Sequence, residues 1–289
     1  MVTDIFMILA CVPLYVVNSF CDKIVSSKEQ NRYNYFYNAV KFLICSVCML
    51  PMLFFEKKTV FAAGSLFCGI CCGIMYAISK TVMLRGYEKT SVAFMTLCHS
   101  SGMILPCIIG HFFWSEKLRV TSVFGMILAI LSIVLLKGGN EKNKNFNFKG
   151  SVFGVIIFLT SAGVMIAQKL MGIYFAEQSI SAYNFYSFVV AFLIICCFVR
   201  PKQLDSGEKK NKRLACICAL GSAVSLCVIS FVMTSLSGRV PSVLLFPLFN
   251  GLGIIFVCIG SVFAFKEKLT VKKLIGLPLG VIGLCLVNL

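Results

Sequence analysis

One stretch of this chain occurs twice, and each copy holds enough apolar residues to cross a membrane two times. Residues 91–136 and 242–287 align without a gap and share 15 identities over 46 positions. Each copy has a long apolar run, then the tripeptide Glu-Lys-Leu at 116–118 or 267–269, and then a second apolar run. A repeated pair of helices inside an apolar chain is typical of membrane transporters.

The whole chain carries too few charged residues for a soluble protein. Charged residues make up 13% of it and hydrophobic residues 59%, whereas about a quarter of the residues of a soluble protein are charged. A helix needs about 20 apolar residues to cross the hydrocarbon core of a bilayer. We therefore predict an all-α polytopic membrane protein with ten transmembrane helices, at 4–21, 34–55, 62–84, 91–112, 120–136, 151–173, 183–199, 214–236, 242–264 and 272–288.

The duplication extends through both halves of the chain. At an offset of 150, residues 33–36 (Tyr-Asn-Tyr-Phe) match residues 183–186 (Tyr-Asn-Phe-Tyr). We divide the chain into a first five-span repeat (1–137), a linker (138–150) and a second five-span repeat (151–289). Because five is odd, the second repeat crosses the membrane in the opposite direction. The predicted architecture is thus two inverted five-helix repeats.

Charges in the loops predict the orientation of the chain. The loops after the odd-numbered spans carry 19 lysine and arginine residues, and those after the even-numbered spans carry 5. By the positive-inside rule the first set lies in the cytoplasm and both termini lie outside. We expect a multi-pass integral protein of the cell (cytoplasmic) membrane.

The same composition argues against several other functions. The net charge of +16 comes from short loops, where basic residues contact lipid headgroups, so no nucleic-acid partner is expected. The 16 cysteines lie mostly inside apolar spans and are expected to pack as small apolar side chains, so no metal or other cofactor is expected. All eleven acidic residues fall at span ends or in loops. This disfavours a carboxylate proton relay, a buried counter-charge for a cation, and an enzyme active site.

Lys41 is the strongest candidate for a substrate contact, because it lies about eight residues into its span. That depth is roughly 12 Å at 1.5 Å per residue. An isolated ammonium group there is costly and needs a wet cavity, a partner or an anionic substrate. The alternative is a lysine that extends along its stem to the headgroups, which is the better explanation of Lys80.

Further candidates are neutral or weakly basic groups. His99 and Asn250 are repeat-equivalent and lie where a midplane site is expected. A transferable proton on His99 and an interhelical hydrogen bond are both open explanations. Tyr76 shares a helical face with Gly69 and Gly73, whose spacing favours close helix packing. The predicted substrate-binding residues are Lys41, Tyr76, Lys80, His99, Gln168, Asn184 and Asn250.

Each half of the chain ends its fourth span with an acidic turn, at Glu116 and Glu267, and continues into a span that contains Gly125 or Gly276. Lys41-Phe42-Leu43 adds a basic-aromatic-aliphatic pattern in the second span. In duplicate, this arrangement resembles the EamA-type transporters of the drug/metabolite transporter superfamily. From the residues themselves, Glu116 and Glu267 are expected to neutralise adjacent lysines and to fix the short turns.

The chain departs from the family pattern at two places. The proline that the family often carries midway along the fourth span is replaced by His99-Ser100. The membrane-embedded glutamate that the small multidrug-resistance relatives use for proton exchange has no counterpart in the first span. The resemblance implies a multi-span carrier of small metabolites or drugs and does not identify the substrate.

We expect a secondary transporter that moves a small metabolite or drug-like solute by alternating access. Its partners would be a small-molecule substrate and the lipid bilayer, and it would act as a monomer or homodimer. Basic and polar groups without buried acids favour a substrate with a carboxylate or phosphate, or a neutral polar metabolite. No Walker motif is present, which excludes ATP hydrolysis by this chain. The alternatives are a flippase of a lipid-linked carrier and a non-transporting membrane accessory subunit.

Overall fold

The computed structural model describes residues 2–25, 33–56, 58–89, 92–117, 119–137, 148–199, 209–265 and 271–288. Within these ranges the chain forms α-helices and no β-strand, which confirms the predicted all-α class. In chain order the helices are α1 (Val2–Val25), α2 (Asn34–Glu56), α3 (Ala63–Lys89), α4 (Val92–Ser101), α5 (Ile104–Phe113), α6 (Val120–Lys137), α7 (Phe148–Tyr174), α8 (Ile180–Cys196), α10 (Lys209–Ser237), α11 (Ser242–Phe265) and α12 (Val271–Asn288).

These helices coincide with the predicted spans to within a few residues at each end. Among the described residues, α1, α2, α3, α7 and α10 contain segments long and apolar enough to cross a membrane. The α4–α5 pair, α6, α8 and α11 contain shorter apolar segments. The ten-span inverted arrangement stays a prediction.

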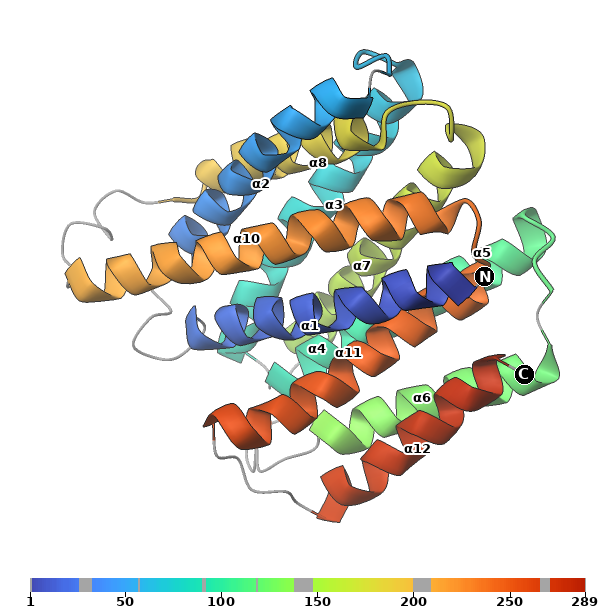
Figure 1. Cartoon of the computed structure of the whole chain (residues 1–289). Helices are drawn as coiled ribbons and strands as arrows, with labels where there is room; N and C mark the ends of the chain where they lie inside the picture. Colours follow the sequence, from blue (N-terminus) through green and yellow to red (C-terminus); the bar gives the residue numbers. More distant parts are fainter. Residues whose placement is uncertain are drawn as a thin grey trace.

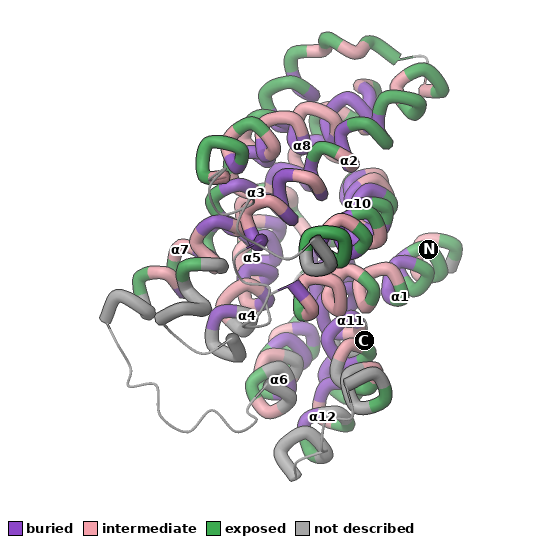
Figure 2. The backbone as a smooth tube through the Cα atoms, turned by 90° about the vertical axis from the view of Figure 1, so that its left-hand side faces the viewer, coloured by how far each residue is buried: buried purple, intermediate pink, exposed green. Residues whose placement is uncertain are grey.

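The outer surface of the bundle is apolar, as expected for a protein surrounded by lipid. Phe54, Phe55, Phe61, Phe112 and Phe263 are all at least 76% exposed. Figure 2 shows buried positions on the sides of the helices that face one another and exposed positions on their outer sides. A soluble monomer rarely exposes so many large apolar side chains.

Helices from the two predicted halves pack against each other in a reciprocal pattern. Helix α1 packs on α10 and α11, and its repeat counterpart α7 packs on α3 and on α4–α5. The counterparts α2 and α8 pack on each other, as do α6 and α12, which lie side by side in Figure 1. Each of the cross-half contacts named here thus has an equivalent made by the counterpart helices.

The fourth predicted span is not one continuous helix, which corrects the prediction for 91–112. It forms α4 and α5, separated at Gly102 and Met103. In a continuous α-helix the His99 carbonyl would accept a hydrogen bond from the Met103 N–H. Here that carbonyl accepts from the Gly102 N–H at 3.3 Å and from the Ser161 hydroxyl of α7 at 2.6 Å. The side-chain bond from α7 replaces part of the helical ladder, and this accounts for the break.

Helices α3 and α8 approach closely where the sequence predicts glycine-mediated packing. A Cβ atom placed on Gly73 would lie 2.5 Å from the carbonyl oxygen of Ser187, and one placed on Gly69 would lie 2.9 Å from that of Tyr183. Both oxygens belong to the backbone of α8 and cannot move aside by a change of rotamer. Small residues are therefore required on this face of α3.

Replacing Gly73 by alanine should destabilise the protein by about 1–3 kcal/mol, the usual cost of forcing extra atoms into a packed interface. The measurement is the melting temperature of purified protein in detergent. Gly221→Ala is the matched control, because a Cβ atom there meets its nearest neighbour, the Cys21 sulfur, only at 3.8 Å. Equal melting temperatures for the two variants would contradict the close approach of α3 and α8.

Candidate functional site

Lys41 lies fully buried on α2 and contacts two side chains of α1. Its ammonium group donates to Asn18 Oδ1 at 2.6 Å and to Asp22 Oδ1 at 3.2 Å. The lysine side chain is 0% exposed. Of the sequence-based explanations for Lys41, the structure therefore supports a charged partner and excludes extension of its stem to the headgroups.

Asp22 is shared between two lysines from different helices. Its Oδ2 atom lies 3.2 Å from the ammonium group of Lys80 on α3, while Oδ1 accepts from Lys41 and, at 2.6 Å, from the hydroxyl of Tyr37. The Tyr37 oxygen lies 2.9 Å from the hydroxyl of Ser222 on α10, which brings the second half into contact. We call Asn18, Asp22, Tyr37, Lys41 and Lys80 the Asp22 cluster.

The Asp22 cluster has unequal access to its surroundings. The side chains of Asp22 and Lys80 are 32% and 20% exposed, in contrast to the enclosed Lys41. With two ammonium groups and one carboxylate, the cluster carries an excess positive charge. Any solute that approaches the cluster therefore meets Asp22 and Lys80 before the enclosed Lys41.

A second charged group joins the two halves near the other end of the bundle. Glu116, which follows α5, lies 2.7 Å from the ammonium group of Lys169 on α7. Lys169 also donates to the carbonyl of Val240 at 2.8 Å, and Glu116 accepts from the backbone N–H of Ser242, the first residue of α11, at 2.7 Å. A carboxylate at the first N–H groups of a helix is favourable. We call Glu116, Lys169, Val240 and Ser242 the Glu116 cluster.

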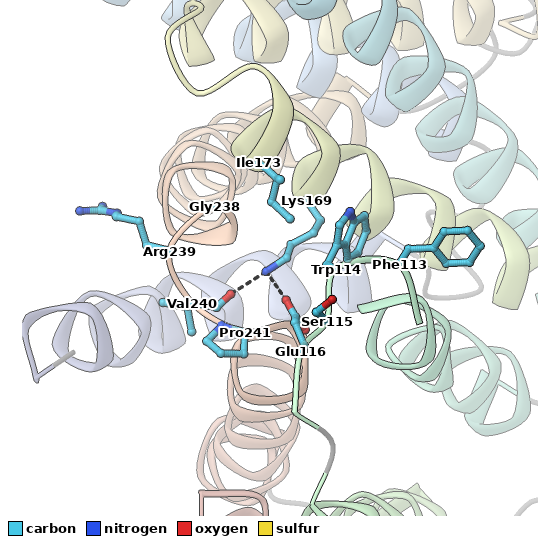
Figure 3. Close-up of a pocket in the computed structure, with 10 residues that line it drawn as sticks. All are labelled: Phe113, Trp114, Ser115, Glu116, Lys169, Ile173, Gly238, Arg239, Val240 and Pro241. Atoms are coloured by element: carbon cyan, nitrogen blue, oxygen red, sulfur yellow. Dashed lines mark hydrogen bonds and ion pairs between the residues drawn. The ribbon is translucent and has the colours of Figure 1, made fainter. Parts of the chain in front are cut away.

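The Glu116 cluster is nearly closed to solvent but lies among the residues of an open pocket. The side chains of Glu116 and Lys169 are 9% and 3% exposed. The pocket has a volume of about 440 Å³ and is lined by residues 113–116, Lys169, Ile173 and residues 238–241. Figure 3 shows the Lys169 ammonium group directed between the Val240 carbonyl and Glu116, beside the Trp114 ring, whose centroid is 6.0 Å away.

The two clusters lie toward opposite ends of the molecule. Asp22 is in the last turn of α1, and Glu116 follows the end of α5. These two helix ends point to opposite sides of the bundle in Figure 1. The first turn of α1 and the last turn of α12 lie toward the same side as the end of α5.

Tyr76 and Asn184 lie between α3, α8 and α10. The Tyr76 ring packs against Phe42 and Phe188, with centroid distances of 5.9 and 6.2 Å. Asn184 is fully buried, donates to the Ile180 carbonyl within its own helix and accepts from the Ser230 hydroxyl of α10 at 2.6 Å. The described bonds of Asn184 fit an interhelical contact, and its role as a substrate ligand stays a prediction.

The other predicted residues lie on separate helices. His99 is on α4, where its carbonyl bonds to Ser161. Asn250 is buried on α11 and donates to the Phe246 carbonyl one turn earlier. Gln168 is buried on α7, and its backbone carbonyl accepts a hydrogen bond from the Ser237 hydroxyl. The predicted set is therefore brought together in part: Lys41 and Lys80 share one partner, and the contacts above do not join His99, Gln168 and Asn250 to that cluster.

Sequence reasoning missed two charged partners. Asp22 lies beyond the predicted end of the first span, but α1 continues to Val25; its position four residues after Asn18 was the available signal, since both then lie on one helical face. Lys169 lies within the predicted span 151–173 but was not proposed for the site. Glu116 was assigned to neutralise adjacent lysines, and here it pairs with Lys169, distant in sequence. Glu267 lies outside the described residues.

Comparisons with known proteins point to one family. The model of the EamA-like transporter family matches residues 2–137 and again residues 148–289. A curated relative, the uncharacterized transporter YxxF of Bacillus subtilis (strain 168), is 27% identical over 103 residues, and this match covers 36% of this chain and only about a third (32%) of that protein. A crystal structure of a protein that is 14% identical superposes with a TM-score of 0.78, covering 99% of this chain and 96% of the other, which shows a shared fold.

Replacing Lys169 by methionine should lower the free energy of unfolding by about 3 kcal/mol, because it leaves the enclosed Glu116 carboxylate without its counter-charge. Lys117→Met, at an exposed lysine next in sequence to Glu116, is the control and should have little effect. The double variant Glu116→Gln, Lys169→Met should regain part of the loss, because removing both charges is often close to neutral. Thermal unfolding in detergent of the parent protein, Glu116→Gln, Lys169→Met and the double variant measures this coupling, and additive effects of the two single changes would contradict it.

Proposed function

This chain belongs to the EamA-like transporter family, and we propose that it is a secondary transporter that moves a small metabolite or drug-like solute across the cytoplasmic membrane by alternating access. It is an integral multi-pass membrane protein, and its family is in general not one of enzymes. The observation that carries the proposal is the pair of charged clusters at opposite ends of the bundle, each with contacts to both halves. Catalysis forms no part of the proposed function.

The proposed architecture is two inverted five-helix repeats, 1–137 and 151–289, joined by residues 138–150. Two observations support it. The family model matches the chain twice, once in each half, and every cross-half helix contact described above has a reciprocal contact between the counterpart helices. A two-fold relation between the halves produces such reciprocity, and an odd number of spans per half makes the relation an inversion.

Alternating access requires a contact between the halves that closes one end while the other is open. The Glu116 cluster has the properties of such a contact: Glu116 belongs to the first half, its partners belong to the second, and the side chains of its ion pair are almost fully enclosed. The Asp22 cluster, at the other end, keeps two partly exposed charged groups. We propose that in this conformation the enclosed Glu116–Lys169 ion pair joins the halves beneath the pocket at its own end, while Asp22 and Lys80 stay partly exposed at the other end.

The proposed solute site starts from Lys41 and Lys80, with Tyr76 and Asn184 further along α3 and α8. Lys41 and Lys80 present positive charge inside the bundle, and Tyr76 adds an aromatic face. His99, Gln168 and Asn250 are proposed to line the solute pathway at other depths and are not needed for the charge site.

Purified protein in liposomes tests the transport proposal directly. Flux of one solute class, saturable and dependent on the protein, is the expected outcome. Movement of labelled lipid between leaflets without solute flux would instead identify a flippase. Neither activity, with folded protein in the bilayer, would identify an accessory subunit and overturn the proposal.

Lys41→Met should abolish solute flux while leaving folded protein, because Asp22 and Lys80 would remain as a neutral pair. Flux in liposomes measures the effect, and gel filtration in detergent confirms the fold. Lys117→Met removes the same charge from an exposed position and should transport normally. Normal flux by the Lys41 variant would eliminate this lysine from the solute site.

Glu116→Gln should favour opening of the end that carries the Glu116 cluster. Cys107 of α5 is a built-in reporter, because it is 0% exposed and its sulfur lies 3.5 Å from the Ser242 carbonyl. Loss of about 1.4 kcal/mol of contact energy would increase its alkylation rate about ten-fold. Peptide mass spectrometry after exposure to a membrane-impermeant maleimide measures the rate at Cys107, with Glu177→Gln as the control. An unchanged rate would show that the Glu116 cluster does not close this end.

A further inference from the structure

We propose that the Asp22 carboxylate occupies, in the empty transporter, the position taken by a carboxylate or phosphate group of the substrate when it binds. The inference deepens the proposed function, since it rests on the Asp22 cluster being the solute site. It names the substrate as an anion and Asp22 as its internal competitor. The substrate replaces the ion pairs and the hydrogen bond of Asp22, and no covalent bond forms or breaks.

The geometry of the Asp22 cluster is that of an anion site already filled. The two oxygens of one carboxylate face two ammonium groups, Oδ1 toward Lys41 and Oδ2 toward Lys80, each at 3.2 Å. The Tyr37 hydroxyl adds a third donor at 2.6 Å. A carboxylate or phosphate of a solute presents the same pair of oxygens to the same donors.

The ion pairs of Asp22 are looser than the other bonds of the cluster. Charge-assisted N–H···O bonds are typically about 2.7–2.9 Å long, whereas both lysine contacts of Asp22 are 3.2 Å. Lys41 is held more closely by the neutral Asn18 oxygen, at 2.6 Å. Asn18 therefore keeps Lys41 in place when the carboxylate leaves, and the site persists without Asp22.

Access distinguishes Asp22 from Glu116, whose carboxylate also pairs with a lysine of another helix. The Asp22 side chain is 32% exposed, and Glu116 is 9% exposed. Helix α1 packs mainly on α10 and α11, yet Asp22 extends to lysines on α2 and α3. A carboxylate that crosses between helices and remains partly exposed can withdraw into water, which a sealed one cannot do.

A cationic substrate fits the same cluster poorly. To bind Asp22, a cation would have to displace the ammonium groups of Lys41 and Lys80. Lys41 is 0% exposed, so it would stay buried without its counter-charge, at high cost in a membrane. An anion that displaces Asp22 instead leaves both lysines paired and frees only the group that is already accessible.

The test measures the melting temperature of the full-length protein in detergent while orthophosphate, succinate or n-butylammonium is added at constant ionic strength. A ligand that binds the folded state raises this temperature. The orthophosphate and succinate arms separate phosphate from carboxylate substrates. The n-butylammonium arm tests the cationic alternative.

Asp22→Asn leaves both lysines without their carboxylate. We expect the half-saturating concentration of orthophosphate or succinate to fall about ten-fold, as for the loss of one competing hydrogen-bond partner of a charged group. Glu177→Gln makes the same charge change at an exposed position and should leave the concentration unchanged. Equal or weaker anion binding by the Asp22 variant would overturn the inference, as would stabilisation by n-butylammonium that this variant loses.

Lys80→Met provides an independent readout if the Asp22 variant does not fold. It leaves one lysine with one carboxylate, so stabilisation by anions should disappear, and its persistence would overturn the inference. The transport proposal and the anion-site inference are contradicted by different results. Tighter anion binding by the Asp22 variant without solute flux would refute transport and keep the anion site. Flux of a cationic solute that requires Asp22 would keep transport and refute the anion site.

Discussion

A buried ammonium group inside a membrane protein requires a partner, and this requirement organises the charged interior of the bundle. Lys41 has no exposed surface, and water is not available in hydrocarbon to stabilise its charge. Asn18 and Asp22 on α1 supply the acceptors, and Asp22 extends the arrangement to Lys80 on α3. One carboxylate thus connects α1, α2 and α3, each of which packs mainly on other helices. Lys169 meets the same requirement with Glu116.

The apolar parts of the structure serve a complementary purpose. Without a hydrophobic force between helices in lipid, close backbone approach and interhelical hydrogen bonds determine which helices pair. Gly73 against the Ser187 carbonyl and the Ser161–His99 hydrogen bond both act where the two halves meet. Small residues and hydroxyls therefore set the distance between the halves. The charged clusters determine which charged groups can be bound between them.

The sequence predicted the helices well because apolar length and internal duplication are properties of the chain alone. The sequence did not predict how each helix is rotated about its own axis, and this rotation decides which side chains meet. Lys41 was singled out from its depth, but its partner Asp22 became visible only when α1 proved to continue to Val25. Lys169 lies within a predicted span, but its pairing with Glu116 depends on how α7 packs beside the end of α5. The break after Ser101 likewise depends on Ser161, which is distant in the chain.

That break has a mechanical consequence. A ten-residue helix is about 15 Å long, half of a hydrocarbon core of about 30 Å, so in the proposed ten-span arrangement α4 and α5 would cross together, with their junction near mid-depth. Irregular backbone at that depth is tolerated only where protein covers it, and the hydroxyl of Ser161 provides this cover for the His99 carbonyl. The Ser161–His99 hydrogen bond therefore resists separation of α4 from α7 at this junction, because separation would leave the His99 carbonyl without this partner in an apolar surrounding.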